Sequence, residues 1–312
     1  MTFDDINSLA KKGIPFLFIS DFKANSIKVI ELDKLKEHDI EFCIDEDYTI
    51  KKHQCFLRKY PLDFEAYRQK FDFVIEKIKS GETYLLNLTQ ATKIDTKLTL
   101  KQIYNNANAQ YKLRYKDEFV CFSPERFITI KNNKISTYPM KGTIDASVEN
   151  AEQKILSNQK EMAEHVMVVD LLRNDLSVVA TNVRVDKFRY ITKIEAGEKN
   201  LLQVSSSISG DLSDGWQSRL GDILKALLPA GSISGTPKKS TLEIIDEVEG
   251  YDRGYFSGVF GVFDSQSFQS GVMIRFIQKT DNGYLYKSGG GITLDSLPKD
   301  EYDELLHKIY IP

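Results

Sequence analysis

The sequence predicts an α+β fold in which large antiparallel β-sheets pack face to face with helices on the outside. Strand-like runs recur along the whole chain, and amphipathic helical stretches are segregated between them. No internal repeat, low-complexity segment or Pro/Ser-rich linker divides the sequence. We expect residues 1–60 to form a short strand-rich segment packed on the core, and residues 61–312 to form the main domain.

Composition narrows the class of protein. Of the 312 residues, 41% are hydrophobic, which is enough for a substantial core. The net charge of −3 comes from acidic and basic residues spread along the chain, without a long basic block that could follow a phosphate backbone. We therefore expect no nucleic-acid partner.

The cysteines and the N-terminus indicate the compartment. Cys43, Cys55 and Cys121 are widely spaced and form no CxxC pair, which argues against a disulfide framework and a structural zinc site. The N-terminus has no basic leader, and its longest apolar run, Pro15–Ile19, is too short to cross a bilayer. We expect a soluble, cytoplasmic protein that does not act in a membrane.

The early strands and helices are predicted from the spacing of apolar residues and from residues that begin or end a helix. Phe16–Ile19 and Ile27–Glu31 predict short strands. The stretch from Leu62 to Lys79 predicts an amphipathic helix, because its apolar residues recur at helical spacing, Asp63 can cap it and Gly81 can end it. A β-rich run follows, and then a second helix near residues 100–108.

A hairpin is expected in the middle of the chain. Arg126–Lys131 and Lys134–Tyr138 are β-rich, and the two asparagines between them tolerate the positive φ of a tight turn. If Lys131 faces Lys134, Glu125 lies opposite Met140 at the open end, next to Lys141. Regular pairing is expected to stop before Lys141, because Pro139 cannot donate to a ladder. Residue types alone also fit a surface hairpin with a solvated Glu and Lys.

The second half predicts further helices and strands. Helices are expected over residues 147–176, near 216–228, and over 239–247 and 298–309, and strands over Val183–Tyr190, Leu201–Ile208, Gly258–Phe263, Val272–Ile277 and Gly283–Lys287. Within the first of these helices, Asp170, Arg173, Asn174 and Asp175 lie among apolar residues, where buried charges need partners.

Paired acids on two helices are candidate metal ligands. Glu161 and Glu164 are three residues apart on one helix, and Glu301, Glu304 and Lys308 repeat this spacing near the C-terminus. Two Glu-x-x-Glu pairs could supply the oxygen ligands that Mg²⁺ prefers. The alternative is ordinary solvated helix faces, which this spacing alone favours.

Glycine clusters and one arginine point to an anionic ligand. The loop Gly231–Gly235 and the run Gly289–Gly291 could present backbone N–H groups to an anion, or could be structural turns. Arg275 is the only charge in an apolar strand, so it either meets a buried acid or binds a ligand carboxylate. No zinc-like histidine spacing and no Gly-x-Ser-x-Gly elbow occurs. A small dianionic substrate held by Mg²⁺ fits these residues.

These motifs resemble one family. From about Gly81 to Lys308 the chain resembles the chorismate-utilising enzymes, namely the large subunits of anthranilate synthase and aminodeoxychorismate synthase, and the isochorismate and salicylate synthases. The motifs occur in the order of that family: Asn87–Gln90, Ser123–Phe127, Pro139–Thr143, Glu164 to Asp175, Gly231–Lys238, Ile274–Arg275, Gly289–Ile292 and Glu301–Glu304. Together they argue against the solvated-surface interpretations.

The resemblance implies roles for matching positions, and makes residues 61–312 a chorismate-binding catalytic domain. The implied Mg²⁺ ligands are Glu161, Glu164, Glu301 and Glu304. The implied contacts to the carboxylates of chorismate are Gly142 and Thr143 for the ring carboxylate, with Arg275, Gly289, Gly290, Gly291 and Lys308. Glu125 matches the general acid that protonates the leaving 4-hydroxyl.

Lys141 indicates the subfamily. The chain resembles aminodeoxychorismate synthase component I, which has Lys where the other members usually have Ala. The resemblance implies that Lys141 attacks C2 of chorismate and that ammonia then adds at C4, giving 4-amino-4-deoxychorismate for 4-aminobenzoate and folate synthesis. We expect the pKa of Lys141 to be lowered by burial or by the cation. Ammonia is expected from a separate glutamine amidotransferase subunit, because no cysteine here lies in a glutaminase-like motif.

One departure and two alternatives accompany this interpretation. Many members have His-Leu-Val-Ser where this chain reads Leu202-Gln-Val-Ser205, so Gln203 or His165 would have to compensate for the missing histidine. The first alternative is an anthranilate synthase-like reaction that expels pyruvate. The second is a catalytically silent, chorismate-binding regulatory protein.

Overall fold

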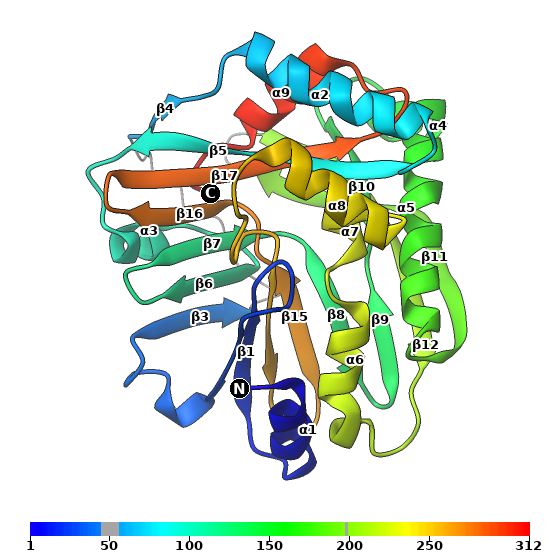
Figure 1. Ribbon diagram of the computed structural model, residues 1–312. Coiled ribbons are helices and arrows are strands. Elements are labelled where there is room, and N and C mark those ends of the chain that lie inside the picture. The colour runs from blue at the N-terminus through cyan, green and yellow to red at the C-terminus, as the bar shows by residue number, and fades with distance from the viewer. Residues whose placement is uncertain (45–55, 197–198) are drawn as a thin grey trace.

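Two antiparallel sheets with helices on their outer sides make up the fold (Figure 1). The computed structural model describes residues 1–44, 56–196 and 199–312, and within it the side chains of residues 194–199 are not described. Cys55 lies outside the described residues. The predicted fold class is confirmed. No helix of the described part is long and apolar enough to cross a membrane.

The larger sheet has nine strands. Its order is β10 (Met140–Asp145), β12 (Lys199–Asp211), β9 (Lys134–Thr137), β8 (Arg126–Lys131), β15 (Phe268–Val272), β14 (Val259–Phe263), β1 (Phe16–Ser20) and β2 (Ile27–Glu31), with β11 (Thr181–Ala196) paired to β12. Strands β8, β9 and β15 run along the length of the molecule in Figure 1.

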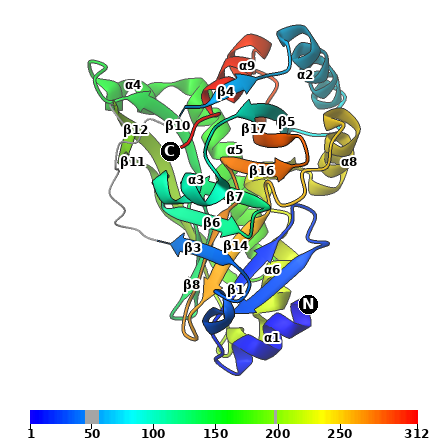
Figure 2. The same cartoon turned by 90° about the vertical axis from the view of Figure 1, so that its left-hand side faces the viewer.

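The second sheet has eight strands. Its order is β13 (Gly235–Thr236), β5 (Leu85–Asp95), β17 (Gly283–Ile292), β16 (Phe276–Thr280), β7 (Phe119–Ser123), β6 (Tyr111–Tyr115) and β3 (Ile40–Ile44), with β4 (Arg58–Tyr60) paired to β5. Its strands run across the molecule (Figures 1 and 2). Side chains of both sheets share one buried cluster, which includes Leu17, Phe260, Leu113 and Phe276.

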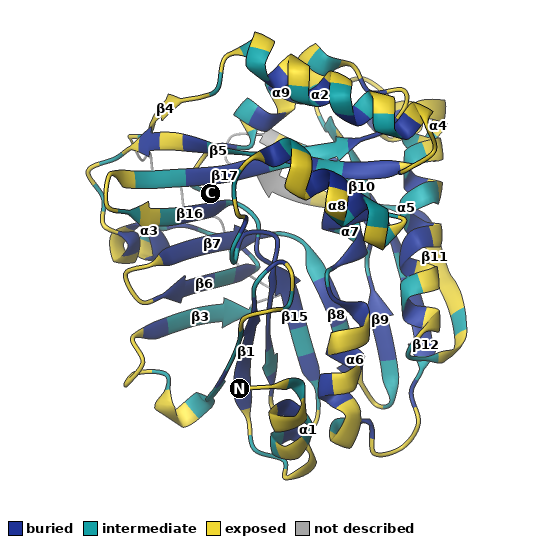
Figure 3. Cartoon of the chain, in the orientation of Figure 1, coloured by how far each residue is buried: buried dark blue, intermediate teal, exposed yellow. Residues whose placement is uncertain are grey.

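The helices cover the sheets from outside. They are α1 (Phe3–Lys11), α2 (Phe64–Lys79), α3 (Leu100–Asn106), α4 (Ala151–Ser157), α5 (Gln159–Ser177), α6 (Leu220–Leu227), α7 (Gly231–Ser234), α8 (Lys238–Glu249) and α9 (Pro298–His307), with 3₁₀ turns η1 (Leu32–Lys34) and η2 (Trp216–Arg219). Buried residues gather in the central strands and on the helix faces that meet them (Figure 3).

The N-terminal residues belong to both sheets. Strand β1 pairs with β14 of the larger sheet, and β3 pairs with β6 of the second sheet. Helix α1 was not predicted. Its start is specified by a capping box, in which the Asp5 N–H donates to Thr2 Oγ1 and the Thr2 N–H donates to Asp5 Oδ2.

The central hairpin is confirmed with its register. Lys131 pairs with Lys134, and Asn132 and Asn133 adopt φ of 50° and 57° in the turn. Strand β9 ends at Thr137, before Pro139, and the chain then moves away so that β10 pairs with β12. Regular pairing therefore stops before Lys141, as expected.

Two predicted elements were wrong in their extent. The helix expected over 147–176 is two helices, α4 and α5, because the Asn158 side chain accepts from the Glu161 N–H and begins a new helix. The strand expected over Val272–Ile277 is two strands of different sheets. The chain turns between them at Arg275, whose φ is 51°, so this arginine is not in a strand interior.

Two neighbouring strand pairs cross between the sheets at the same place. Strand β7 leads into β8, and β15 leads into β16, while β7 pairs with β16 and β8 pairs with β15. The Val272 N–H donates to the Glu125 carbonyl at 3.1 Å, and the Phe122 N–H donates to the Ile274 carbonyl at 3.1 Å. These crossovers bring Glu125 and Arg275 together.

Candidate active site

Glu125 and Arg275 lie at the crossover, on the wall of a small cavity. The cavity has a volume of about 90 Å³, and its lining also includes Asn87, Ser232, Lys287, Gly289 and Lys308. The Ser232 hydroxyl donates to Glu125 Oε1 at 2.6 Å. Burial raises the pKa of the Glu125 carboxyl, although Ser232, Lys308 and Arg275 act against this rise. We call this space the inner cavity.

Lys141 lies in a cluster of carboxylates. Its Nζ is 2.8 Å from Glu164 Oε2, and the two side chains are 30% and 12% exposed. Burial lowers the pKa of Lys141, but Glu164, with Glu304 and Glu301, outweighs burial and leaves the pKa above its ordinary value. The expected lowering of this pKa was therefore wrong for the metal-free protein, because an ion pair with Glu164 favours the ammonium form.

A β-bulge after Lys141 places Gly142 in a backbone conformation that favours glycine. The register between β10 and β12 shifts between Met140 and Thr143, and Gly142 adopts a φ of 92°. A Cβ on Gly142 would be strained at this φ and, at 2.9 Å from Glu161 Oε2, would displace the Glu161 carboxylate. Thr143 is exposed and pairs with Gln203 across the ladder.

Helix α9 brings the second pair of acids to the face of β17. A Cβ on Gly290 would lie 3.2 Å from Glu301 Oε2 and 3.6 Å from Glu304 Oε1. Lys308 Nζ lies 2.5 Å from Glu304 Oε1 and donates to the Gly289 carbonyl at 2.8 Å. Although burial raises the pKa of Glu304, Lys308 outweighs it, and the pKa is lowered.

The glycine run was expected after a strand, either as a structural turn or as N–H groups for an anion, and the turn was wrong. Gly289, Gly290 and Gly291 lie inside β17, where they pair with Thr89, Leu88 and Asn87 of β5. The physical reason is close approach. Because Gly290 has no side chain, the carboxylates of α9 and the amine of Lys308 can reach the sheet surface.

The donor set suits a hard cation. Glu161 Oε2 is buried without a hydrogen-bond partner, and burial together with Glu164 raises the pKa of the Glu161 carboxyl. Burial also raises the pKa of Glu301, whose Oε1 accepts from Ser296 at 2.7 Å. Across the part of the chain with described placement, no three His, Cys, Asp or Glu side chains already stand close enough to hold an ion together. The acids fit Mg²⁺ in chemistry and would have to converge to bind it.

The predicted residues thus form two neighbouring groups. Glu125, Arg275 and Lys308 line the inner cavity, and the acids gather around Lys141. Glu304 links the two groups, because it pairs with Lys308 and its charge helps to raise the pKa of Lys141. The hairpin had suggested that Glu125 meets Lys141 directly, but Glu125 contacts Ser232 instead.

The charged end of α5 is mostly solvated, contrary to expectation. Asp170 and Arg173 are exposed and bond to each other at 2.7 Å, and Asn174 is exposed. Only Asp175 is partly buried, with a pKa raised by burial, and it pairs with Lys238 at 3.1 Å. Asp170, Arg173 and Asn174 lie at the surface and need no buried partner, whereas the partly buried Asp175 has one.

His165 lies behind Lys141. It was one of two residues expected to compensate for the missing family histidine. Its ring is fully buried, with Nε2 2.7 Å from Ser206 Oγ and Nδ1 3.4 Å from the Lys141 carbonyl. Leu202 is buried in β12. His165 therefore contacts the backbone of Lys141, and Gln203 lies opposite Thr143.

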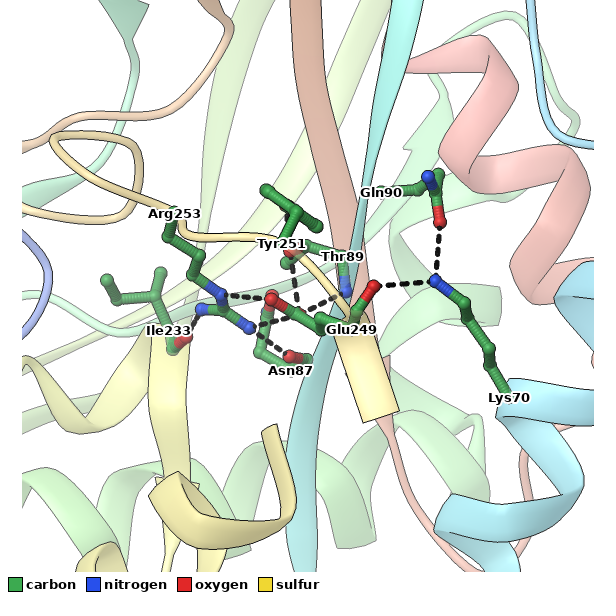
Figure 4. A network of polar contacts seen from close by, with 8 residues as sticks. All are labelled: Lys70, Asn87, Thr89, Gln90, Ile233, Glu249, Tyr251 and Arg253. Atoms are coloured by element: carbon green, nitrogen blue, oxygen red, sulfur yellow. Dashed lines mark hydrogen bonds and ion pairs between the residues drawn. The ribbon is translucent and has the colours of Figure 1, made fainter. Parts of the chain in front are cut away.

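A buried ion pair behind the site was not predicted (Figure 4). Glu249 and Arg253 are each 2% exposed, and Arg253 Nη2 lies 2.6 Å from Glu249 Oε1. Arg253 also donates to the carbonyls of Ile233 and Asn87, and Glu249 accepts from the Thr89 N–H. The network therefore ties α7 and β5, which line the inner cavity, to α8.

Lys287 and Ser232 were also missed. Lys287 is 3% exposed, lines the inner cavity and donates to the Arg253 carbonyl at 2.8 Å. Burial lowers its pKa to about 8. The sequence signal for Ser232 was its place in the cluster Gly231–Gly235. The Ser232 hydroxyl, and not a backbone N–H group as predicted, reaches the site. A charged residue in the β-rich run before a glycine cluster was the signal for Lys287.

The fold and this site define a class of protein, and comparison with known proteins identifies it. The family model described as chorismate binding enzyme matches residues 24–312. The chain belongs to this family of chorismate-utilising enzymes. A structure of the menaquinone-specific isochorismate synthase MenF from Escherichia coli superposes with a TM-score of 0.72 at 15% identity, covering 96% of this chain and 78% of that one.

Individual relatives are similar over most of the chain. A Haemophilus influenzae protein called "Uncharacterized PabA-like protein" is 46% identical over 99% of this chain and 95% of its own length. Aminodeoxychorismate synthase component 1 of Bacillus subtilis is 30% identical over 93% of this chain and 63% of its own. Anthranilate synthase component 1 of Archaeoglobus fulgidus is 33% identical over 78% of this chain and 61% of its own.

Proposed function

We propose that the protein is an aminodeoxychorismate synthase component I, which converts chorismate and ammonia to 4-amino-4-deoxychorismate. The observation that carries this proposal is Lys141, an amine among the carboxylates of Glu164, Glu301 and Glu304, beside a cavity that holds Glu125 and Arg275. Amine, acid and cationic side chains are the groups that a covalent substitution on an anionic ring requires.

The proposed reaction has two substitutions. The Lys141 amine forms a bond to C2, the two ring double bonds shift, and the C4–O bond breaks as Glu125 gives its proton to the hydroxyl, which leaves as water. Ammonia then bonds to C4, the double bonds shift back, and the C2–N bond to Lys141 breaks. The added nitrogen returns a proton to Glu125, and the enolpyruvyl group stays on the ring.

The environment of Glu125 supports its role as the acid. A general acid must hold its proton near neutral pH, and burial raises the pKa of Glu125 in that direction. Arg275 and Lys308 lie on the same cavity and would bind carboxylates of the substrate.

Glu161, Glu164, Glu301 and Glu304 would hold Mg²⁺. The bound cation would supply positive charge for the ring carboxylate of chorismate. Lys141 already holds Glu164 in the metal-free protein, so a cation that takes Glu164 as a ligand competes with Lys141 for this carboxylate. Gly142 keeps the space beside Glu161 open.

Ammonia would come from a glutamine amidotransferase subunit. Relatives named component 1 of aminodeoxychorismate or anthranilate synthase support a partner, because their names describe one part of an assembly. Synthesis of 4-aminobenzoate, and a cytoplasmic location, follow from the same proposal.

An anthranilate synthase-like reaction is the second candidate. Relatives with that name are as similar to this chain as those named aminodeoxychorismate synthase. It would aromatise the ring and expel pyruvate, and it gives Lys141 no covalent task. A catalytically silent chorismate-binding protein would give neither Lys141 nor Glu125 a catalytic function.

Product analysis distinguishes these functions. The purified chain is mixed with chorismate, Mg²⁺ and concentrated ammonium at alkaline pH, and the products are analysed by mass. We expect 4-amino-4-deoxychorismate with its enolpyruvyl group retained. Anthranilate with free pyruvate would replace the proposal by the second candidate, and chorismate bound but unchanged after addition of a glutaminase subunit would leave a binding protein.

A further inference from the structure

A second, larger cavity opens on the other side of the crossover. It has a volume of about 480 Å³ and lies between the β6–β7 turn, the β16–β17 turn and the segment after α8. Its lining includes the rings of Phe119, Tyr255 and Phe276 and, nearer solvent, Asp117 and Asp281. We call this space the outer cavity. The proposed reaction, as described above, does not use the outer cavity.

Side chains that line the outer cavity lie next to side chains that line the inner cavity. Phe276 lines the outer cavity, and its ring centroid is 6.0 Å from that of Phe256, which lines the inner cavity. Lys287 lines the inner cavity, with its Nζ 5.8 Å from the Phe276 centroid. The same Nζ donates to the carbonyls of Asp252 and Arg253, and the next residue, Gly254, lines the outer cavity.

We infer that ammonia enters through the outer cavity and passes between Phe276 and Lys287 into the inner cavity. The inference rests on the proposed function, and it assigns a route to that reaction's second substrate. Ammonia is about the size of water, so a small shift of these side chains opens a passage that chorismate cannot use.

Lys287 suits the selection of ammonia over ammonium. Two N–H groups of its Nζ are held by the carbonyls of Asp252 and Arg253, which leaves the third tetrahedral direction for another partner. As an ammonium group it can donate there to the lone pair of ammonia. An ammonium ion has no lone pair and is repelled by Lys287, Arg275 and Lys308, all of which line the inner cavity.

The route also delivers ammonia to the correct side of the substrate. Lys287 and Glu125 line the same small cavity. Under the proposed reaction Glu125 faces the hydroxyl that leaves C4, and ammonia bonds to that carbon. Ammonia entering past Lys287 therefore arrives on the side of the cavity where the bond must form.

Filling the outer cavity tests the route. Phe276, Gln278 and Thr280 alternate along β16 and all line this cavity, so Gln278→Trp and, separately, Thr280→Trp would fill it without touching the inner cavity. Initial rates are measured at saturating chorismate with varied ammonium chloride, and then with chorismate varied. We expect the KM for ammonia to rise about tenfold, equivalent to about 1.4 kcal/mol, with the KM for chorismate unchanged.

Two further variants sharpen the result. Lys193→Trp places the same side chain at an exposed site on β11, and it should leave both KM values unchanged. Lys287→Met keeps an unbranched apolar stem but removes the amine, and it should also raise the KM for ammonia. Circular dichroism checks that each variant is folded.

The outcomes separate the inference from the proposed function. If the wild-type chain forms no aminated product from chorismate and ammonium, the proposed function fails and the route fails with it. If the wild type is active and both filling variants keep its KM for ammonia, the route alone is overturned.

Discussion

Two residues of the site have raised pKa values for different reasons. Burial raises the pKa of Glu125 although the Ser232 hydroxyl donates to it, whereas Lys141 lies against Glu164, which raises the pKa of an amine. In the metal-free protein the protonated form of each group is therefore favoured more than in a free side chain. Under the proposed function, Glu125 would act as the acid, and a cation that takes Glu164 as a ligand would free the Lys141 amine to act as the nucleophile.

Replacing Lys141 tests its covalent role. Incubated with chorismate and Mg²⁺ but without ammonia, the wild type should gain the mass of chorismate less one water, which intact-protein mass spectrometry detects. Lys141→Ala should form no adduct, and its amination rate should fall by at least about tenfold, or about 1.4 kcal/mol in barrier. Some activity should remain if ammonia attacks directly.

Lys131 offers a matched control for this experiment. It is exposed on the same hairpin that leads to Lys141. Lys131→Ala should form the adduct at the wild-type rate. An adduct of equal yield in Lys141→Ala would contradict the role.

The raised pKa of Glu125 makes stability depend on pH. The folded protein holds this proton more tightly than the unfolded chain, whose Glu pKa is about 4.3. The stabilisation is complete below that value and is lost as pH rises through the folded pKa. Glu125→Gln cannot lose a proton, so it should unfold at a higher temperature than the wild type at pH 8 and at the same temperature at pH 4.

Thermal unfolding across this pH range measures the effect. Each pKa unit of the rise corresponds to about 1.4 kcal/mol, which is a few degrees for a chain of this size. The exposed Glu76 on α2 provides the control, since Glu76→Gln should change the unfolding temperature little at any pH. A variant less stable than the wild type at pH 8 would show that ionised Glu125 is favoured in the fold.

At the scale of elements, prediction succeeded where patterns are local. The hairpin β8–β9 and helix α2 follow from asparagines, a capping Asp63 and apolar spacing, all readable over a few residues. Prediction failed where partners are distant. The break at Arg275 depends on β16 pairing with β7, and Gly290 stays in a strand because α9 packs against it.

The same distinction holds for the site. Motif order gave most candidate residues, including both pairs of acids, which the fold does bring near Lys141. The contacts that these residues make could not be predicted from the sequence. Ser232 reaches Glu125 only because α7 packs beside the crossover, and Arg253 joins Ile233 to Asn87 across a large separation in sequence.

Helix α8 offers a comparison of buried and exposed ion pairs. Glu249→Ala would leave Arg253 buried without its partner and should cost about 3–5 kcal/mol of unfolding free energy, measured in urea. Asp246 on the same helix pairs with Lys23 at 2.7 Å, and both side chains are exposed. Asp246→Ala should cost no more than about 1 kcal/mol. Equal losses would mean that the buried network contributes no more than a surface pair.

At the scale of the whole molecule, the candidate cation site joins the two sheets. Helix α5 follows β10 of the larger sheet, and α9 follows β17 of the second sheet. Each helix contributes one pair of acids, and Lys141 lies between them. An ion shared by both pairs would link segments that are otherwise held together by the common core and the crossovers.

Binding of Mg²⁺ should therefore stabilise the whole fold. A ligand that binds only the folded state at about 100 times its Kd adds about 2.7 kcal/mol, so MgCl₂ should raise the unfolding temperature of the wild type, and EDTA should reverse the rise. Glu164→Gln should lose most of this shift, because it removes a ligand charge. Glu152→Gln, at an exposed position on α4, should keep it. The same shift in both variants would place the cation elsewhere, and no shift in the wild type, with chorismate present or absent, would remove Mg²⁺ from the proposal.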